Sequence, residues 1–394
     1  MKILYITTRL PYPVIGGDKV RAYHMMRLLK QLGHEITLVC LYDEQDNLEE
    51  ALKHTEFFDR IYPIKFNKKL AYLTTPWAVI NDKPFIVQYF YSNDMQRQID
   101  KLLKEEHFDL LTGYMPRIAP YYEKHKKENV IIDLCDAFSM TYKRRVNVTK
   151  SWFDKLKFTI EYLKMKNLER KCLRDFNSQI VISKYDKQYL ESISKKSNLH
   201  IVSNGVDTDY FSPQETELKN NICFVGSLRY IANLEAAIYF AREVFPLIKK
   251  EIPDAKFKII GAYPKPILYE IAKEIEGIEV TGRVDDVRDY MKDCKVSVCP
   301  VRIAGGVQNK ILEAMSMEIP VVTTREGLEG IDAPADILPI ATTNQEYAQK
   351  VINIMRNHKL RSLMAQKSRK FIINNFSWDS VALQLKNTIL GYKQ

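Results

Sequence analysis

The positions of the glycines are the first feature of this sequence that suggests chemistry. Only 14 of the 394 residues are glycine, yet two pairs occur, Gly16-Gly17 and Gly305-Gly306, and Gly226 ends a strand-like run. A glycine between a strand and a helix lets backbone N–H groups and the helix N-terminus point at a phosphate. The pattern therefore favours a phosphate-bearing ligand, and plain turns are the alternative.

Two charged residues follow the second glycine pair on a helix that we expect at residues 308–317. Lys310 and Glu313 are three residues apart, so they would share one face of that helix. The ammonium group could neutralise such a phosphate, whereas a solvated lysine and a solvated glutamate are the ordinary alternatives. The chain contains neither G-x-G-x-x-G nor G-x-x-x-x-G-K-[ST], which argues against nicotinamide and P-loop chemistry.

Short apolar strands alternate with amphipathic helices, and these elements must position the residues above. In the first half of the chain the pattern predicts a helix at 18–32 and strands at 2–7, 34–41, 109–113, 130–134 and 179–182. In the second half it predicts helices at 234–250 and 308–317 and strands at 221–226, 256–261, 278–281, 295–299 and 320–323. Such alternation is typical of βαβ units and parallel sheets.

The pattern restarts after a turn-rich linker near residue 204, which predicts two α/β domains. We expect doubly wound, Rossmann-like domains at 1–203 and 204–375, and a C-terminal helix at 376–394 that returns towards the first domain. Ligands bind such sheets at the carboxyl ends of the strands. The cleft between the two domains is therefore the expected site.

Composition and charge indicate a globular protein of the cytoplasm. The chain has 59 Lys+Arg and 49 Asp+Glu residues, a net charge of +10, and 46% apolar residues. No apolar run reaches the roughly 18 residues of a transmembrane helix, and the first residues read as a strand rather than a signal peptide. The six cysteines show neither C-x-x-C nor a metal-ligand pattern, so we expect most of them to be buried thiols.

These segments together resemble the retaining, nucleotide-sugar-dependent glycosyltransferases of the group 1, family 4-like type, which have the GT-B fold of two Rossmann-like domains facing a cleft. The resemblance covers nearly the whole chain. The runs that carry it are Ser203-Asn-Gly-Val-Asp207, Val280-Thr-Gly-Arg-Val-Asp-Asp-Val-Arg288, Val298-Cys-Pro-Val-Arg302, Gly305-Gly-Val-Gln-Asn-Lys-Ile-Leu-Glu-Ala-Met315 and Ile319-Pro-Val-Val322. Two further runs resemble sugar transferases of bacterial exopolysaccharide clusters: Gly17-Asp-Lys-Val-Arg-Ala-Tyr-His24 and Asp133-Leu-Cys-Asp-Ala-Phe-Ser139.

The resemblance assigns roles to the donor-side residues. It implies that Glu313 accepts hydrogen bonds from the ribose hydroxyls of the donor, a task that suits an acceptor-only carboxylate. It implies that Lys310 neutralises the departing diphosphate. The remaining residues expected to bind the donor are Gly16, Gly17, Gly226, Arg283, Val284, Gly305, Gly306 and Val307.

The chain departs from the family at three donor-side positions. Many members have an arginine and a lysine where this chain has Ser227 and Ala232, and an acidic residue where it has Gly305. Arg229 and Lys310 are the best substitutes for the usual basic pair, and we assign both a catalytic role. Asn233 is expected to cap the helix that follows it.

Acceptor-side residues are expected in the first domain, and the mechanism follows from the family. The candidates are His24, Tyr114, Asp136 and Ser139, although a histidine such as His24 more often lies on an ordinary helix face. Retention without an enzymic nucleophile fits a front-face displacement in which the diphosphate takes the acceptor proton. No Asp-x-Asp motif is placed to hold a cation on the donor, so we expect neither a metal nor another cofactor.

Residues 141–176 form a strongly basic segment, with eleven Lys+Arg and four Asp+Glu. Phe153, Leu156, Ile160 and Leu163 share one helical stripe, and lysines recur every seven residues at 150, 157, 164 and 171. A basic amphipathic helix is typical of proteins on anionic membranes, so it predicts a peripheral position on the inner membrane face. A solvated helix packed on its own domain is the alternative. Nothing in the motifs indicates nucleic acid.

Three functions remain open on these grounds. The first is transfer of a sugar from a nucleotide sugar to a glycan or lipid-linked glycan in cell-surface polysaccharide biosynthesis. The second is a nucleotide-sugar epimerase on the same fold, for which we find no suitable acid and base cluster. The third is a non-enzymatic nucleotide-sugar-binding or scaffold protein, which the departures at Ser227, Ala232 and Gly305 would allow.

Overall fold

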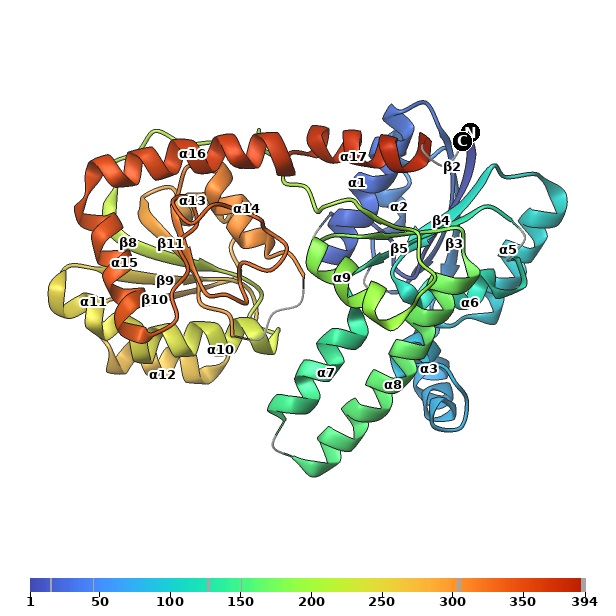
Figure 1. Ribbon diagram of the computed structural model, residues 1–394, viewed down its shortest axis with the longest axis horizontal. Coiled ribbons are helices and arrows are strands. Elements are labelled where there is room, and N and C mark those ends of the chain that lie inside the picture. Colours follow the sequence, from blue (N-terminus) through green and yellow to red (C-terminus); the bar gives the residue numbers. More distant parts are fainter. Residues whose placement is uncertain (15, 45, 126–127, 150, 303–305, 391–394) are drawn as a thin grey trace. The chain divides into compact units, whose positions relative to one another are not determined.

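A computed structural model describes residues 1–14, 16–44, 46–125, 128–149, 151–302 and 306–390, and the chain forms two compact units (Figure 1). Unit 1 comprises Met1–Ser203 and the C-terminal segment from Ala382, and unit 2 comprises Asn204–Val381. Unit 2 therefore extends beyond residue 375, where we expected the second domain to end. The first residues of the C-terminal helix belong with unit 2, because the ring of Trp378 packs directly against Gly205.

Unit 1 is built on a parallel sheet of seven strands in the order β3-β2-β1-β4-β5-β6-β7. The strands are β1 (Lys2–Thr7), β2 (Glu35–Tyr42), β3 (Arg60–Lys65), β4 (Leu110–Tyr114), β5 (Val130–Cys135), β6 (Ser178–Val181) and β7 (Leu199–Ile201). The pattern had not predicted β3 and β7, since β3 is a half-exposed edge strand containing Pro63 and β7 is only three residues long. The strand order reverses between β1 and β4, where open α/β sheets bind ligands.

Helices cover both faces of this sheet, and two of them project from it. The α-helices are α1 (Gly17–Gln31), α2 (Leu48–Ala51), α3 (Lys68–Thr74), α4 (Phe85–Phe90), α5 (Asn93–Glu105), α6 (Ala119–Tyr122), α7 (Phe138–Val148), α8 (Trp152–Asp175) and α9 (Lys184–Ile193). Short 3₁₀ turns occur at η1 (Thr55–Phe57), η2 (Thr75–Val79), η3 (Pro116–Ile118) and η4 (Glu123–His125). The helices α7 and α8 lie side by side as a hairpin (Figure 1).

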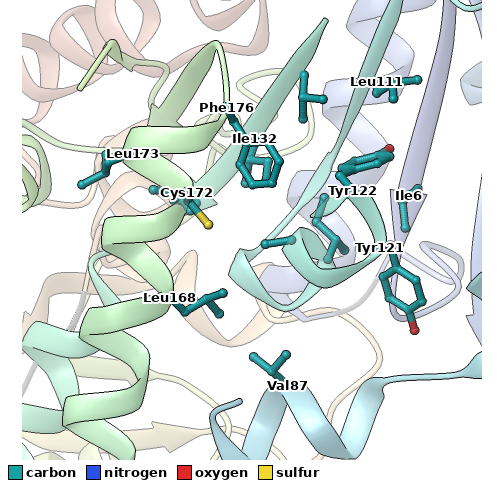
Figure 2. Close-up of a cluster of buried hydrophobic side chains, with 14 of the residues drawn as sticks. Ile6, Val87, Leu111, Tyr121, Tyr122, Ile132, Leu168, Cys172, Leu173 and Phe176 are labelled. Atoms are coloured by element: carbon teal, nitrogen blue, oxygen red, sulfur yellow. The ribbon is translucent and has the colours of Figure 1, made fainter. Parts of the chain in front are cut away.

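The core of unit 1 joins three central strands to α8 and the short helix α4. In Figure 2, Ile6, Leu111 and Ile132 come from β1, β4 and β5, and Leu168 approaches them from α8. The ring of Tyr122 lies within this cluster, and its hydroxyl donates to the backbone oxygen of Thr112 at 2.7 Å. All six cysteines of the chain are free and buried, as expected of small apolar side chains.

Unit 2 is built on a second parallel sheet, in the order β10-β9-β8-β11-β12, with its reversal between β8 and β11. The strands are β8 (Lys219–Val225), β9 (Lys256–Ile260), β10 (Ile278–Gly282), β11 (Cys294–Cys299) and β12 (Val321–Thr323). The helices are α10 (Ile231–Tyr239), α11 (Phe245–Glu251), α12 (Pro266–Glu274), α13 (Arg288–Met291), α14 (Asn309–Ser316), α15 (Asn344–Arg356) and α16 (His358–Phe376). The last helix, α17 (Trp378–Leu390), begins in unit 2 and belongs to unit 1 from Ala382 on. A π-helical turn, η5 (Phe240–Val244), joins α10 to α11, so the predicted helix at 234–250 is one interrupted run.

Candidate functional site

Lys310 lies at the switch point of the sheet in unit 2 and is held there by neutral groups. Its ammonium donates to Oδ1 of Asn233 at 2.8 Å and to Oε1 of Gln308 at 3.1 Å. The prediction that Asn233 caps α10 is wrong, because the cap residue is Tyr230 and Asn233 lies inside the helix. The amide of Asn233 instead joins α14 to the loop after β8: it accepts from Lys310 and donates to the backbone oxygen of Ser227 at 3.0 Å.

Gly226 makes room for this arrangement at the end of β8. A Cβ at this position would lie 2.8 Å from Nδ2 of Asn233 and 3.0 Å from its Cγ. The neighbouring strand end is tighter still, since a Cβ at Gly261 would lie 2.0 Å from the backbone oxygen of Gly226. The glycines that follow β8 and β9 are therefore required by close packing around Asn233, which in turn positions Lys310.

Glu313 lies one turn after Lys310 on α14 and is partly buried. Burial raises the pKa of its carboxyl group to about 7, and the positive charge of Lys310 opposes that rise. Its carboxylate makes no hydrogen bond or ion pair with the residues that the structure describes. A partly buried carboxylate with open acceptor positions beside an ammonium group can bind hydroxyl donors of a ligand.

The other donor-side candidates are spread along the carboxyl edge of the same sheet. Arg229 is exposed, and its guanidinium stacks 3.8 Å from the ring centre of Tyr263. Arg283 and Val284 follow β10 and stand exposed and half-exposed, respectively. Gly306 and Val307 are buried directly before α14, and Gly306 has a φ of 70°. Gly305 lies outside the described residues.

In unit 1 the first glycine pair begins α1 at the corresponding switch point. Gly16 is the cap residue, with a φ of 95°, and Gly17 is the first residue of the helix. Asp18 follows and pairs with two arginines, at 2.9 Å from Arg9 and 3.7 Å from Arg117. Sequence reasoning missed Arg117, whose side chain is mostly buried and whose pKa is lowered to about 10 by that burial.

The two runs that resemble exopolysaccharide transferases meet in a buried ion pair. Arg21 of α1 donates to both carboxylate oxygens of Asp133 in β5, at 2.8 and 3.2 Å. The same guanidinium donates to the backbone oxygens of Val202 and Ser203 at 3.0 and 3.1 Å. Arg21 is 1% exposed, so this contact ties α1, the sheet and the end of unit 1 together.

Among the four acceptor-side candidates, Asp136 has a carboxylate oxygen that is left available to accept a hydrogen bond. It follows β5, and its Oδ1 is buried without a hydrogen-bond partner among the described residues. Burial, together with the charge of Asp186, raises the pKa of Asp136 to about 7. Such a group can bind a hydroxyl, and it can exchange a proton near neutral pH.

The other three candidates are occupied or buried. Ser139 donates its backbone N–H to Oε1 of Glu169 at 3.0 Å, and its hydroxyl donates to the second oxygen of that carboxyl group. Tyr114 is buried, with its hydroxyl 3.4 Å from Sγ of Cys135. His24 lies on the buried face of α1. Sequence reasoning had missed Glu169, whose pKa is raised to about 7 by burial.

The basic segment forms α7 and α8, and three of the four side chains of its apolar stripe stand exposed, while Ile160 is half-buried. Phe153, Leu156 and Leu163 are exposed. Two of the heptad lysines bind the chain instead: Lys164 donates to backbone oxygens of Ala78 and Asn81, and Lys171 pairs with Asp82. Lys157 is exposed, and Lys150 lies outside the described residues.

Two absences concern the described part of the chain alone. No three His, Cys, Asp or Glu side chains are grouped there as a metal site requires. No helix there combines the length and the apolar character that crossing a bilayer demands.

Comparison with protein families gives two matches that together span most of the chain. Residues 15–210 match the model described as "Glycosyltransferase Family 4", and residues 219–357 match "Glycosyl transferases group 1". The first match begins after β1 and covers α1 and the strands β2 to β7 of unit 1, and the second covers the sheet of unit 2 with α14.

Comparison with individual proteins agrees along nearly the full length. An "Uncharacterized 44.6 kDa protein in cps region" of Klebsiella pneumoniae is 25% identical over 95% of this chain and 96% of its own. The structure of a sucrose-phosphate synthase from Thermosynechococcus elongatus superposes with a TM-score of 0.73, at 14% identity, over 99% of this chain and 98% of its own. That of Anabaena HepE in complex with UDP-glucose gives 0.67, at 12% identity, over 99% of this chain and 100% of its own. The fold is therefore GT-B.

Proposed function

Since the chain belongs to the group 1, family 4 glycosyltransferases, we propose that it moves a sugar from a nucleotide-sugar donor to a glycan or lipid-linked glycan, with retention at the anomeric carbon. The observation that carries the proposal is the paired arrangement of Lys310 and Glu313 on α14. One offers an uncancelled positive charge and the other offers open carboxylate oxygens. The Klebsiella relative from a cps region and the UDP-glucose bound to HepE support a polysaccharide product and a nucleotide-sugar donor.

In the proposed reaction the bond between the sugar C1 and the diphosphate oxygen breaks while a bond from C1 to the acceptor oxygen forms on the same face. The acceptor proton passes to the departing diphosphate. Charge builds up on that diphosphate, so the ammonium group of Lys310 stabilises the transition state more than the bound donor. Glu313 holds the ribose hydroxyls. Arg229 is the second cation that we assign to the diphosphate, and no metal is needed.

On the acceptor side, Asp136 is the residue that we assign to an acceptor hydroxyl. Its buried Oδ1 has no partner among the described residues, and a hydroxyl would satisfy it. Ser139, Tyr114 and His24 help by packing around β5 and α1 rather than by binding the acceptor. Asp136→Asn should therefore impair transfer to an acceptor while sparing hydrolysis of the donor.

A thermal-shift screen against UDP-, GDP-, ADP- and dTDP-sugars tests the donor assignment. One nucleotide class should raise the melting temperature, and at a hundred times its Kd the stabilisation should be about 2.7 kcal/mol. Slow release of the nucleotide without acceptor should accompany binding and should survive EDTA. Binding with no turnover of the donor would favour the scaffold function, and conversion of the donor sugar to an epimer would favour the second alternative.

Retention needs a product, so it is tested once the donor is known. Proton NMR of the first transfer product should show the anomeric configuration of the donor. An inverted product would refute the front-face mechanism while leaving the donor assignment intact.

A further inference from the structure

Exposed apolar side chains are concentrated in two segments of unit 1 that are far apart in the sequence. Ten of the 21 large hydrophobic side chains that stand exposed on the described chain fall within residues 68–80 and 152–163. We call these ten side chains the apolar patch: Leu70, Tyr72, Leu73, Trp77, Val79, Ile80, Trp152, Phe153, Leu156 and Leu163. Leu73 and Ile80 are each 74% exposed and Trp152 is 77% exposed. Single exposed hydrophobic residues are ordinary on a protein surface, but a group of this size is not.

Specific polar contacts hold the two segments together. Lys164 of α8 donates to the backbone oxygen of Ala78 in η2 and to that of Asn81, just after η2, at 2.6 Å. The buried carboxylate of Glu161 accepts the backbone N–H of Phe85 at 2.7 Å. Figure 1 shows α3 beside the C-terminal half of α8, whose first turns lie at the tip of the α7–α8 hairpin. The apolar patch is therefore a built surface on a braced support rather than a loose loop.

The charges around the apolar patch determine what can cover it. Residues 68–80 contain Lys68 and Lys69 and neither Asp nor Glu, and Lys68 pairs with Asp43 from outside this segment. The first turns of α8 add Lys155 and Lys157, both exposed, against the single exposed carboxylate of Asp154. A second copy of this chain would meet the patch with the same patch in an isologous dimer, and the lysines would face one another. An anionic surface complements the lysines, and a lipid interior accepts the aromatic and aliphatic side chains.

We propose that the apolar patch is a membrane-docking surface that inserts into the headgroup and upper acyl region of an anionic bilayer. Trp77, Tyr72 and Trp152 suit the interface because such rings have an apolar body and a polar edge. The surface differs from the one expected from the basic segment alone. Lys164 and Lys171 brace the support, and Lys68 pairs with Asp43 at 3.0 Å, whereas Lys69, Lys155 and Lys157 face the lipid headgroups.

Tryptophan fluorescence of the full chain reports on this surface directly. The chain has three tryptophans, and two of them, Trp77 and Trp152, belong to the apolar patch. The third, Trp378, is buried in unit 2 and serves as an internal reference. Phosphatidylglycerol vesicles with brominated acyl chains should quench the emission of wild type, Trp77→Phe and Trp152→Phe. They should not quench the variant that has both substitutions.

Matched pairs of surface variants distinguish docking through the apolar patch from non-specific binding of the protein to vesicles. Leu73→Ser with Ile80→Ser should weaken binding to phosphatidylglycerol vesicles at least about tenfold, because each side chain loses its burial in lipid. Leu363→Ser with Ile373→Ser, at exposed positions of α16, should change it less than about twofold. Lys155→Gln with Lys157→Gln should also weaken binding, and Lys273→Gln with Lys359→Gln should not.

Three results would overturn the proposal. They are equal binding to phosphatidylglycerol and phosphatidylcholine vesicles, binding that survives Leu73→Ser with Ile80→Ser, and a dimer in light scattering that these two substitutions convert to monomer without changing vesicle binding. The thermal shift with a nucleotide sugar is measured on the same variants. Because it depends on unit 2, failure of docking and failure of the proposed enzymatic function are separate outcomes.

Discussion

The carboxyl edges of the two sheets both gather charged residues, but they treat those charges differently. In unit 1 the charge of Arg21 is neutralised by Asp133, because both carboxylate oxygens of Asp133 accept hydrogen bonds from the buried guanidinium. In unit 2 the charge of Lys310 is held by the uncharged side chains of Asn233 and Gln308. Neutral partners fix the position of an ammonium group without neutralising it. The first arrangement suits a scaffold, and the second suits the binding of an anion.

Breaking the ion pair of unit 1 should give the largest effect. Arg21→Met leaves Asp133 as an unpaired buried carboxylate, so we expect a loss of about 3–5 kcal/mol in the free energy of unfolding. Arg9→Met is the matched control, because Arg9 also pairs with an aspartate, Asp18, but its own side chain is 52% exposed. This substitution should lower the free energy of unfolding by less than about 1 kcal/mol. Urea unfolding of both variants measures the difference.

A double variant sharpens this test. Arg21→Met with Asp133→Leu removes both charges, so it should be more stable than Arg21→Met alone. If the single and double variants were equally unstable, Arg21 would act through packing rather than through its charge.

Removing the uncancelled charge in unit 2 should affect turnover rather than folding. We expect Lys310→Met to lower kcat of donor cleavage by about 10²–10³-fold, the usual loss when one stabilising group at a departing oxyanion is removed. Asn233→Ala keeps the charge of Lys310 but removes the hydrogen bond that positions its ammonium group, so kcat should fall less than in Lys310→Met. A rise in KM at unchanged kcat would identify Lys310 as a ground-state binding residue instead.

The contrast between the two edges also marks how far the sequence alone leads. The spacing of Lys310 and Glu313 places them on one helix, which is local information, and the strands of unit 2 follow from their apolar runs. The partner of Lys310 is 77 residues away, and Asp133 is 112 residues from Arg21. Such distant contacts depend on how the strands are ordered. For the same reason the sequence suggested that Asn233 is a local helix cap, although its amide joins Lys310 of α14 to the loop after β8.

The surface of unit 1 shows a second limit of sequence patterns. The heptad spacing of Lys157, Lys164 and Lys171 indicates one helix face, but it cannot reveal that a distant segment covers part of that face. Residues 78–82 engage Lys164 and Lys171, and only Lys157 remains exposed. The sequence of residues 68–80 did not predict an exposed surface, because its apolar side chains are typical of a helix buried in a core.

Neutralising Glu313 should weaken the donor in unit 2 to a moderate extent. Glu313→Gln loses charge-assisted hydrogen bonds of roughly 1.5–3 kcal/mol, so we expect about a tenfold or greater rise in the Kd of the donor by calorimetry. Wild-type affinity should increase as the pH rises through about 7, because the carboxyl group ionises there. Affinity of the variant should not follow that rise. Equal affinities of the two proteins at pH 8 would refute the ribose assignment.

The same substitution should stabilise the free protein, by a smaller amount and only at higher pH. Burial raises the pKa of Glu313 from 4.5 to about 7, so the folded state disfavours its charged form. The resulting penalty is absent below pH 4.5, grows as the pH rises to about 7, and is complete above that. Glu313→Gln does not titrate, and we expect it to be more stable than wild type by about 1–2 kcal/mol at pH 8, since partial exposure screens the full shift.

At pH 4.5 the two proteins should unfold at nearly the same urea concentration, so the pH dependence of their difference is the measurement. A protein that gains stability when it loses a ligand-binding group has kept that group at a cost, which is the behaviour expected of a site built for a ligand. If Glu313→Gln were as stable as wild type at pH 8, the carboxylate would be an ordinary solvated helix residue, and the contrast between the two sheet edges would rest on Lys310 alone.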